Sequence, residues 1–111
     1  MSGMMKAARV HRISEKLSID LVEIPEVEPD DVIVEVHASG ICHSDINYRD
    51  GIASVSKLPI ILGHEIAGVI AKTESGTEGI QEGDRVCVHY VISCGTCVFC
   101  RTDRENYCEK Y

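Results

Sequence analysis

Four cysteines near the end of the sequence form the pattern best suited to chemistry. They stand in a C-x2-C-x2-C-x7-C array made of Cys94, Cys97, Cys100 and Cys108. Cysteines separated by two residues place their thiolates in one tight turn, where they converge on a metal, and a fourth thiolate completes a tetrahedron. The surrounding segment has too few apolar residues to hold a shape of its own. The array therefore favours a structural zinc site in a lobe over residues 93–111.

Two other interpretations of this array stay open. Bacterial ferredoxins also carry C-x2-C-x2-C, but their next spacing is three residues followed by Pro. Here the next spacing is seven residues and Glu109 follows. Disulfides would need an oxidising compartment, and the N-terminal residues lack the apolar segment of a secretory signal. We therefore expect the six cysteines to be reduced and the protein to be cytoplasmic.

A second group of metal-binding residue types lies earlier in the chain. Cys42-His43-Ser44-Asp45 is followed, 22 residues after Cys42, by His64-Glu65. A Cys and a His from the ends of two strands can meet at one metal, and catalytic zinc sites use three protein ligands and keep a position open. The alternative is that the cysteine is a small core residue, the histidine a surface group, and Ser44 and Asp45 helix caps.

Composition limits the classes of partner. The chain has 111 residues, enough for one domain, and a formal net charge of −7. Phosphate binding needs a basic face, so we expect no nucleic-acid partner. No apolar run has the length needed to span a bilayer, so we expect no membrane partner either.

The elements that must position these residues are mostly strands. Alternating or Val- and Ile-rich runs predict strands over 4–11, 17–24, 32–38, 66–72 and 85–92, and a short helix over 42–49. Leu17, Ile19 and Leu21 alternate with Ser18 and Asp20, as in a half-buried strand. Cys87 is expected in the core of the last strand. The fold class predicted is mainly β, a small barrel-like sheet structure with excursions.

Four motifs in order resemble the zinc-containing alcohol dehydrogenases of the medium-chain dehydrogenase/reductase superfamily. They are G-I-C-H-S-D, L-G-H-E-I-A-G, E-G-D-R-V and the cysteine array that ends in N-Y-C, and together they span nearly the whole chain. The resemblance implies an N-terminal GroES-like catalytic domain over 1–111, a partly open β-barrel with a short helix and a structural-zinc lobe. One departure is Glu74, where relatives usually have Gly, so Gly76 is expected to take that turn.

The resemblance also implies a role for each motif residue. Cys42 and His64 correspond to two of three catalytic-zinc ligands, and Glu65 to the acidic neighbour that can enter or leave the metal shell. Asp45 corresponds to the carboxylate that orients the zinc-bound His. Ser44 corresponds to the hydroxyl that passes on the substrate's proton. His43 corresponds to a position that approaches the cofactor phosphate or joins that relay.

The implied reaction is oxidation of a small alcohol, or reduction of an aldehyde or ketone, with zinc and with NAD or NADP. No G-x-G-x-x-G occurs in these 111 residues, so we expect the Rossmann cofactor domain, and the third zinc ligand, outside them. Partners would then be that cofactor domain or further copies in a homo-oligomer. Two alternatives stay open, namely a truncated, catalytically inactive zinc-binding module and an electron-transfer iron protein.

Overall fold

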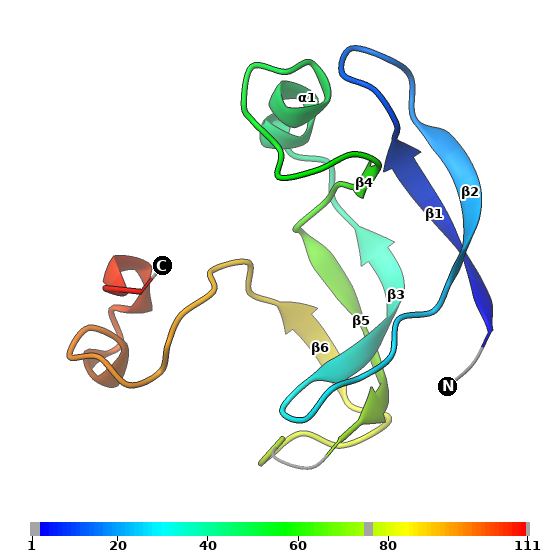
Figure 1. Cartoon of the computed structure of the whole chain (residues 1–111). Coiled ribbons are helices and arrows are strands. Elements are labelled where there is room, and N and C mark those ends of the chain that lie inside the picture. The colour runs from blue at the N-terminus through cyan, green and yellow to red at the C-terminus, as the bar shows by residue number, and fades with distance from the viewer. Residues whose placement is uncertain (1–2, 75–76, 111) are drawn as a thin grey trace.

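The chain forms two antiparallel sheets, a short helix and a separate C-terminal lobe (Figure 1). The computed structural model describes residues 3–74 and 77–110. The mainly β prediction is confirmed, and within these described residues the two sheets do not close into a continuous barrel. The elements are β1 (Met4–Val10), β2 (Ser18–Glu23), β3 (Val32–Ser39), α1 (His43–Arg49), β4 (Ile60–Ile61), β5 (Ile66–Thr73), β6 (Arg85–Val88), η1 (Cys100–Thr102) and η2 (Glu105–Tyr107).

The first sheet has the strand order β2-β1-β4. Its β2 strand alternates as predicted, but the apolar side chains take the more exposed face, with Ile19 and Leu21 at 69% and 66% exposure. The opposite face carries Asp20, whose carboxylate accepts hydrogen bonds from Ser18 Oγ at 2.8 Å and pairs with His11 Nε2 at 2.6 Å. The polar face of β2 is thus the more covered one, and the apolar face that was expected to be half-buried is exposed.

The second sheet, β3-β5-β6, positions the two segments that hold the second group of candidate residues. Ser39, the last residue of β3, pairs with Ile66, the first residue of β5. The chain leaves β3 toward Cys42 and α1, and it enters β5 from His64 and Glu65. Antiparallel pairing therefore brings the two segments to the same end of the sheet.

The last strand is shorter than the predicted 85–92, because β6 ends at Val88. Val88 pairs with Ile66, where β5 begins, so the following residues have no strand to pair with. The prediction that Cys87 lies in the core is wrong as well, since its side chain is exposed. β6 is an edge strand, and the face that carries Cys87 has no covering layer in the described part of the chain. Gly76 lies outside the described residues.

The core of the structure is small. Among residues 3–74 and 77–110, the buried apolar side chains are those of Ala7, Val10, Ile70 and Cys108. The accessible surface is 8452 Å², whereas a compact monomer of 12.2 kDa exposes about 6,100 Å². Large apolar side chains are left uncovered on both sheets and in the loops, among them Ile41, Ile52 and Ile92.

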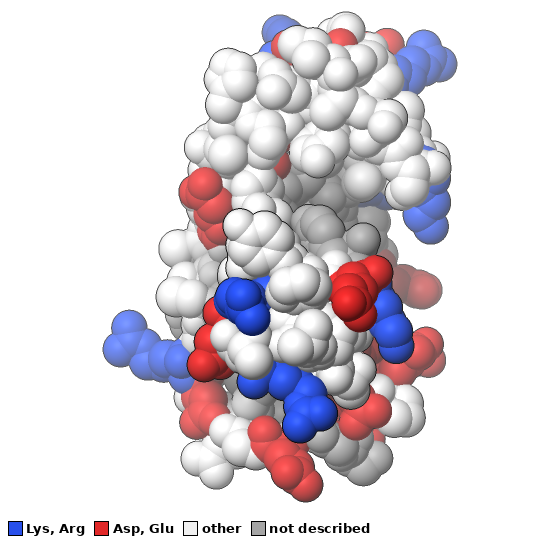
Figure 2. Space-filling model, turned by 90° about the vertical axis from the view of Figure 1, so that its left-hand side faces the viewer, with Lys and Arg blue, Asp and Glu red and all other residues white. Residues whose placement is uncertain are grey.

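Charged side chains are mixed on the surface. On the face that carries the C-terminal lobe, Figure 2 shows acidic and basic groups interspersed over the lower part and mainly uncharged residues over the upper part. The net charge of −7 is therefore not gathered into one acidic area of this face. Among the described residues, no helix has the length and apolar character needed to cross a membrane.

Candidate metal centres

The C-terminal lobe brings its four cysteines together. One ligand atom from each of Cys94, Cys97, Cys100 and Cys108 lies within 4.8 Å of all the others. The turn at Gly95, with φ of +70°, carries the chain from the first cysteine to the second, a conformation that favours glycine. Two short 3-10 helices, η1 and η2, then return the chain so that Cys108 faces Cys94. All six cysteines of the sequence are described, and all are free.

The sulfur positions match one tetrahedral metal ion. A Zn–S bond of about 2.3 Å places two thiolates of a tetrahedron about 3.8 Å apart. Cys94 Sγ and Cys100 Sγ are 3.9 Å apart, and Cys97 Sγ and Cys100 Sγ are 3.5 Å apart. A disulfide would instead join one pair at about 2.05 Å. The donor set and its spacing therefore fit a zinc ion, as the sequence pattern predicts.

Backbone N–H groups in the lobe point at the sulfur atoms. Cys97 N donates to Cys94 Sγ at 3.3 Å, and Cys94 N donates to Cys108 Sγ at 3.3 Å. The hydroxyl and N–H of Thr96, together with the Cys97 N–H, lower the pKa of Cys94 to about 5. Partial burial, and then the neighbouring Cys97, raise the pKa of Cys100 to about 11. The surroundings of the lobe thus favour negative charge on the Cys94 sulfur and disfavour it on the Cys100 sulfur.

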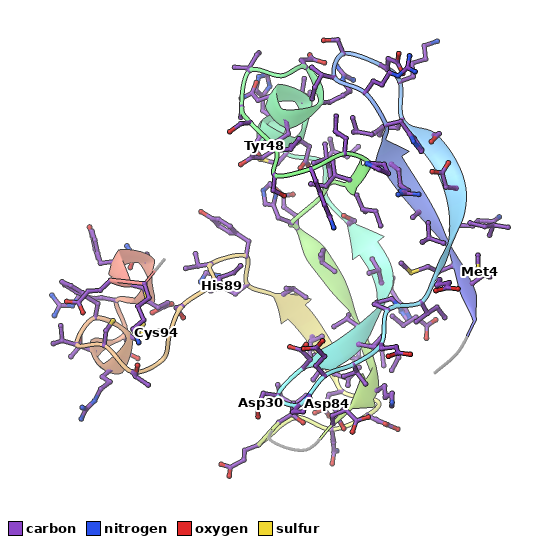
Figure 3. All side chains as sticks on the ribbon, in the orientation of Figure 1. Met4, Asp30, Tyr48, Asp84, His89 and Cys94 are labelled. Carbon is purple, nitrogen blue, oxygen red and sulfur yellow. The ribbon has the colours of Figure 1, made fainter. Side chains whose placement is uncertain are left out.

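Few contacts connect the lobe to the sheets. Phe99 and Tyr107 pack with ring centroids 6.1 Å apart, and the Arg104 guanidinium lies 5.5 Å from the Phe99 centroid. His89 Nε2 and Glu105 Oε1 are 3.8 Å apart, which links the segment after β6 to η2. Figure 3 shows Cys94 in the lobe, with His89 on the connecting segment between lobe and sheets. The lobe is held by its own short-range contacts.

The second cluster joins Cys42, His64 and Glu65. One sulfur, one nitrogen and one carboxylate oxygen lie within 4.8 Å of each other. Cys42 is the N-cap residue of α1, and Gly63, with φ of +114°, turns the chain from β4 toward His64. These three donors fit a zinc ion with one tetrahedral position left open.

Asp45 connects the two segments of this cluster. Its Oδ2 accepts a hydrogen bond from the Cys42 backbone N–H at 3.0 Å. Its Oδ1 lies 3.5 Å from His64 Nδ1, within ion-pair distance but outside hydrogen-bond geometry. The side chain is only 15% exposed, which strengthens its interaction with the ring. The carboxylate thus caps α1 and also faces the histidine.

Ser44 and the His64 ring act on the Cys42 thiol. The Ser44 hydroxyl, the Ser44 N–H and the His64 ring lower the pKa of Cys42. Ser44 Oγ and Asp45 Oδ1 are both buried, and neither has a partner in ordinary hydrogen-bond geometry. Buried polar atoms without partners are uncommon and mark places where a ligand or water is expected. These two atoms beside a three-donor cluster are a second feature that fits a bound metal and substrate.

Two neighbours of the cluster could not be identified from the sequence. The Tyr90 ring lies 5.5 Å from the His64 ring, because the chain leaves β6 early and turns toward the cluster. Gly40 contacts Glu65 across the end of the second sheet. Gly40 opens the G-I-C-H-S-D motif, but neither glycine nor tyrosine is an ordinary zinc ligand, so residue type marks neither of them as part of the site. His43, by contrast, is placed at the start of α1 with its side chain exposed.

Known proteins share this architecture. The family model described as "Alcohol dehydrogenase GroES-like domain" matches residues 28–111. A sorbitol dehydrogenase of Bacillus subtilis is 42% identical over 108 residues, which cover 94% of this chain and 30% of that protein. An NAD-dependent alcohol dehydrogenase of Sulfolobus acidocaldarius is 32% identical over 111 residues, which cover 95% and 32% of the two chains.

Among solved structures, the cobalt- and zinc-bound thermostable alcohol dehydrogenase of Pyrobaculum aerophilum superposes with a TM-score of 0.88 at 32% identity. That match covers 96% of this chain and 33% of the other. The chain therefore spans about a third of the length of the relatives it matches. The fold likeness extends over both sheets and the lobe.

Proposed function

The chain belongs to the alcohol dehydrogenase GroES-like domain family, and we propose that it is the zinc-binding catalytic domain of an NAD- or NADP-dependent alcohol dehydrogenase. The observation that carries this proposal is the grouping of Cys42, His64 and Glu65 within 4.8 Å, on segments outside the four-cysteine lobe. The predicted GroES-like fold is confirmed by the family match and the structural likeness.

In this proposal the two clusters have different roles. The lobe holds a zinc ion that fixes the chain from Cys94 to Cys108. The second cluster holds a zinc ion that supplies Lewis acidity toward a substrate oxygen. The relative from Pyrobaculum aerophilum is cobalt- and zinc-bound by its name, and this supports metal binding by the protein to which the domain belongs. Four thiolates saturate a tetrahedral ion, whereas a Cys/His/Glu set leaves room for an alcohol or carbonyl oxygen.

Each neighbour of the second cluster has a proposed task. Asp45 orients the His64 ring and favours one tautomer, since its Oδ1 faces Nδ1 at 3.5 Å. The buried Ser44 hydroxyl takes the proton of the substrate alcohol and passes it on. His43, exposed at the start of α1, continues this relay or contacts the cofactor phosphate.

Hydride transfer requires a nicotinamide, which supplies the redox chemistry when bound. The Sulfolobus relative is NAD-dependent by its name, and this supports NAD or NADP for the protein to which the domain belongs. The Bacillus relative acts on sorbitol by its name, and this supports a small alcohol or the matching aldehyde or ketone as substrate.

The uncovered apolar surface supports a further partner. An exposed area about 2,300 Å² above that of a compact monomer is large enough to bury against a cofactor domain or a second copy of the chain. We propose that a cofactor domain covers part of it, with homo-oligomer contacts as the alternative. We also propose that the protein is cytoplasmic.

Metal content tests the proposal. Zinc and iron are counted per chain in the purified wild-type protein and in the Cys97→Ser and Cys42→Ser variants. The proposal expects two zinc ions in the wild type and one in each variant. A single zinc that survives Cys42→Ser would favour a non-catalytic zinc-binding module, and iron with visible absorbance would favour an electron-transfer protein.

A further inference from the structure

Gly40 lies directly against the side chain of Glu65. The two residues face each other one step beyond the Ser39–Ile66 pair, where β3 and β5 separate. Gly40 N donates a hydrogen bond to Glu65 O at 2.8 Å, so the antiparallel ladder continues to this pair. The Glu65 backbone is thereby fixed, and the direction of its side chain depends on the space beside Gly40.

That space is filled by the carboxylate itself. A Cβ atom added to Gly40 would overlap Glu65 Oε2 and would lie 3.0 Å from Glu65 Cβ and 3.1 Å from Glu65 Cδ. All three of its nearest neighbours belong to Glu65. Distances of this kind between carbon atoms fall well below the optimum of about 3.5–4.0 Å. Any larger residue at position 40 therefore meets the Glu65 side chain before anything else.

The backbone at Gly40 does not itself require glycine. Its φ lies outside the left-handed range, in contrast to Gly63 and Gly79. Gly68 provides a second contrast, because a Cβ there would meet the Glu35 backbone carbonyl, which cannot move aside. At Gly40 the obstacle is the end of a flexible side chain, so the glycine is needed for the position of Glu65 and not for the fold.

We propose that Gly40 is a positioning residue for the metal centre: its missing side chain leaves the space in which the Glu65 carboxylate lies beside Cys42 and His64. The inference rests on the proposed function, in which these three residues hold a metal. A methyl group at position 40 would turn the carboxylate out of the cluster and leave only the sulfur and nitrogen donors. The second site would then resemble that of a Glu65→Ala chain, which has no carboxylate at this position.

The test is a titration of the full 111-residue chain with Zn²⁺ in competition with a chromophoric chelator. Wild type, Gly40→Ala, Glu65→Ala and the double variant are compared. The four-cysteine lobe provides an internal control and should bind one zinc with unchanged affinity in all four. Zinc affinity at the second site should fall at least about tenfold in Gly40→Ala, the lower end of what loss of ligand support costs.

The double variant separates positioning from other effects. If Gly40 acts through Glu65, Gly40→Ala should cause no further loss in the Glu65→Ala background, because coupled residues are not additive. Gly79→Ala is the matched control, since a Cβ there meets nothing within 4 Å but sits at φ of +76°. It should lower thermal stability and leave zinc affinity at the second site unchanged.

The possible failures are distinguishable. A second site that is equally strong in wild type and Gly40→Ala would overturn the positioning role and leave the proposed function standing. Additive losses in the double variant, or an equal loss in Gly79→Ala, would overturn it in the same way. A wild-type chain with no second zinc at all would overturn both the inference and the proposed site.

Discussion

The two metal clusters of this domain are built in opposite ways. The lobe takes all four donors from one 15-residue segment, Cys94 to Cys108, and holds them with turns and N–H···S contacts. The second cluster takes its donors from two segments whose ends meet only because β3 and β5 pair. A local site can form as soon as metal closes a short loop, whereas a site built on sheet pairing requires the fold first.

The donor sets of the two clusters also differ, because one fills every position around a metal ion and the other does not. Four thiolates occupy every position of a tetrahedral ion, as structural zinc sites do, while the sulfur, nitrogen and carboxylate of the second cluster leave one position open. The closed set belongs to a short segment with few contacts to the sheets, where a metal can serve in place of a larger apolar core. The open set belongs to the end of a sheet, where the fold can hold ligands without saturating the ion.

Cys97→Ser should have the largest effect. Structural zinc contributes about 10–16 kcal/mol of folding free energy in small zinc peptides, and few contacts connect the lobe to the sheets. We expect the variant to lose one zinc and the order of residues 94–108, measured by metal analysis and by amide hydrogen exchange. The second cluster should keep its zinc, since it lies on the sheets.

Cys87→Ser is the control for this experiment. Its thiol is exposed on β6 and belongs to neither cluster, so zinc content and exchange rates should match the wild type. Loss of both zinc ions in Cys97→Ser would contradict the independence of the two clusters.

Cys42→Ser should have a smaller effect on stability and a comparable one on metal content. The variant should lose the zinc of the second cluster, because only His64 and Glu65 remain as donors, while the lobe stays loaded. The sheets do not depend on this ion, so we expect the melting temperature to change by less than in Cys97→Ser. Parallel metal analysis and thermal unfolding measure both quantities, and a larger melting shift than in Cys97→Ser would reverse the comparison.

Asp45→Asn should weaken the second cluster without abolishing it. The amide oxygen can still accept from the Cys42 N–H, but the negative charge 3.5 Å from His64 Nδ1 is lost. Residues that support metal ligands typically contribute about 10–100-fold to affinity, and we expect a loss in that range by chelator competition. Unchanged affinity would show that Asp45 serves α1 as a cap and has no role toward the histidine.

The sequence predicted local features better than features that depend on pairing. The cysteine lobe follows from spacing alone, and strands near 4–11, 17–24, 32–38 and 66–72 follow from alternation. The end of β6 could not be predicted from the sequence, because β6 ends where its partner strand β5 begins, at Ile66. For the same reason the exposure of Cys87 was missed, since an edge strand of an uncovered sheet cannot be recognised from its own residues.

In the site, too, residue types could be predicted from the sequence, whereas contacts that depend on the fold could not. Residue types pointed to Cys42, His64 and Glu65, and the structure brings their donor atoms together, although their roles remain predictions. Tyr90 and Gly40 carry no metal-binding chemistry, so only the geometry reveals that one packs on His64 and the other leaves space for Glu65.

Asp20→Asn should have the smallest effect and should touch only the sheet-built cluster. Asp20 ties β2 to β1 through Arg9, at 3.4 Å, and through His11, and Arg9 pairs with Ile61 of β4, three residues before His64. Hydrogen bonds from Ser18 and His11 hold the pKa of Asp20 below its ordinary value of 3.8. The carboxylate therefore contributes stability above that value, and the contribution is lost as pH falls through the lowered pKa.

Thermal unfolding of the metal-free wild type and Asp20→Asn between pH 7 and pH 3 measures this contribution. The variant should melt slightly lower at neutral pH, because exposed ion pairs contribute little, and the difference should shrink as the wild-type carboxylate becomes protonated. At pH 7 zinc affinity should fall modestly at the second cluster and stay unchanged at the lobe. An equal loss at both clusters would mean that the lobe also depends on the first sheet, against the separation of local and sheet-built sites.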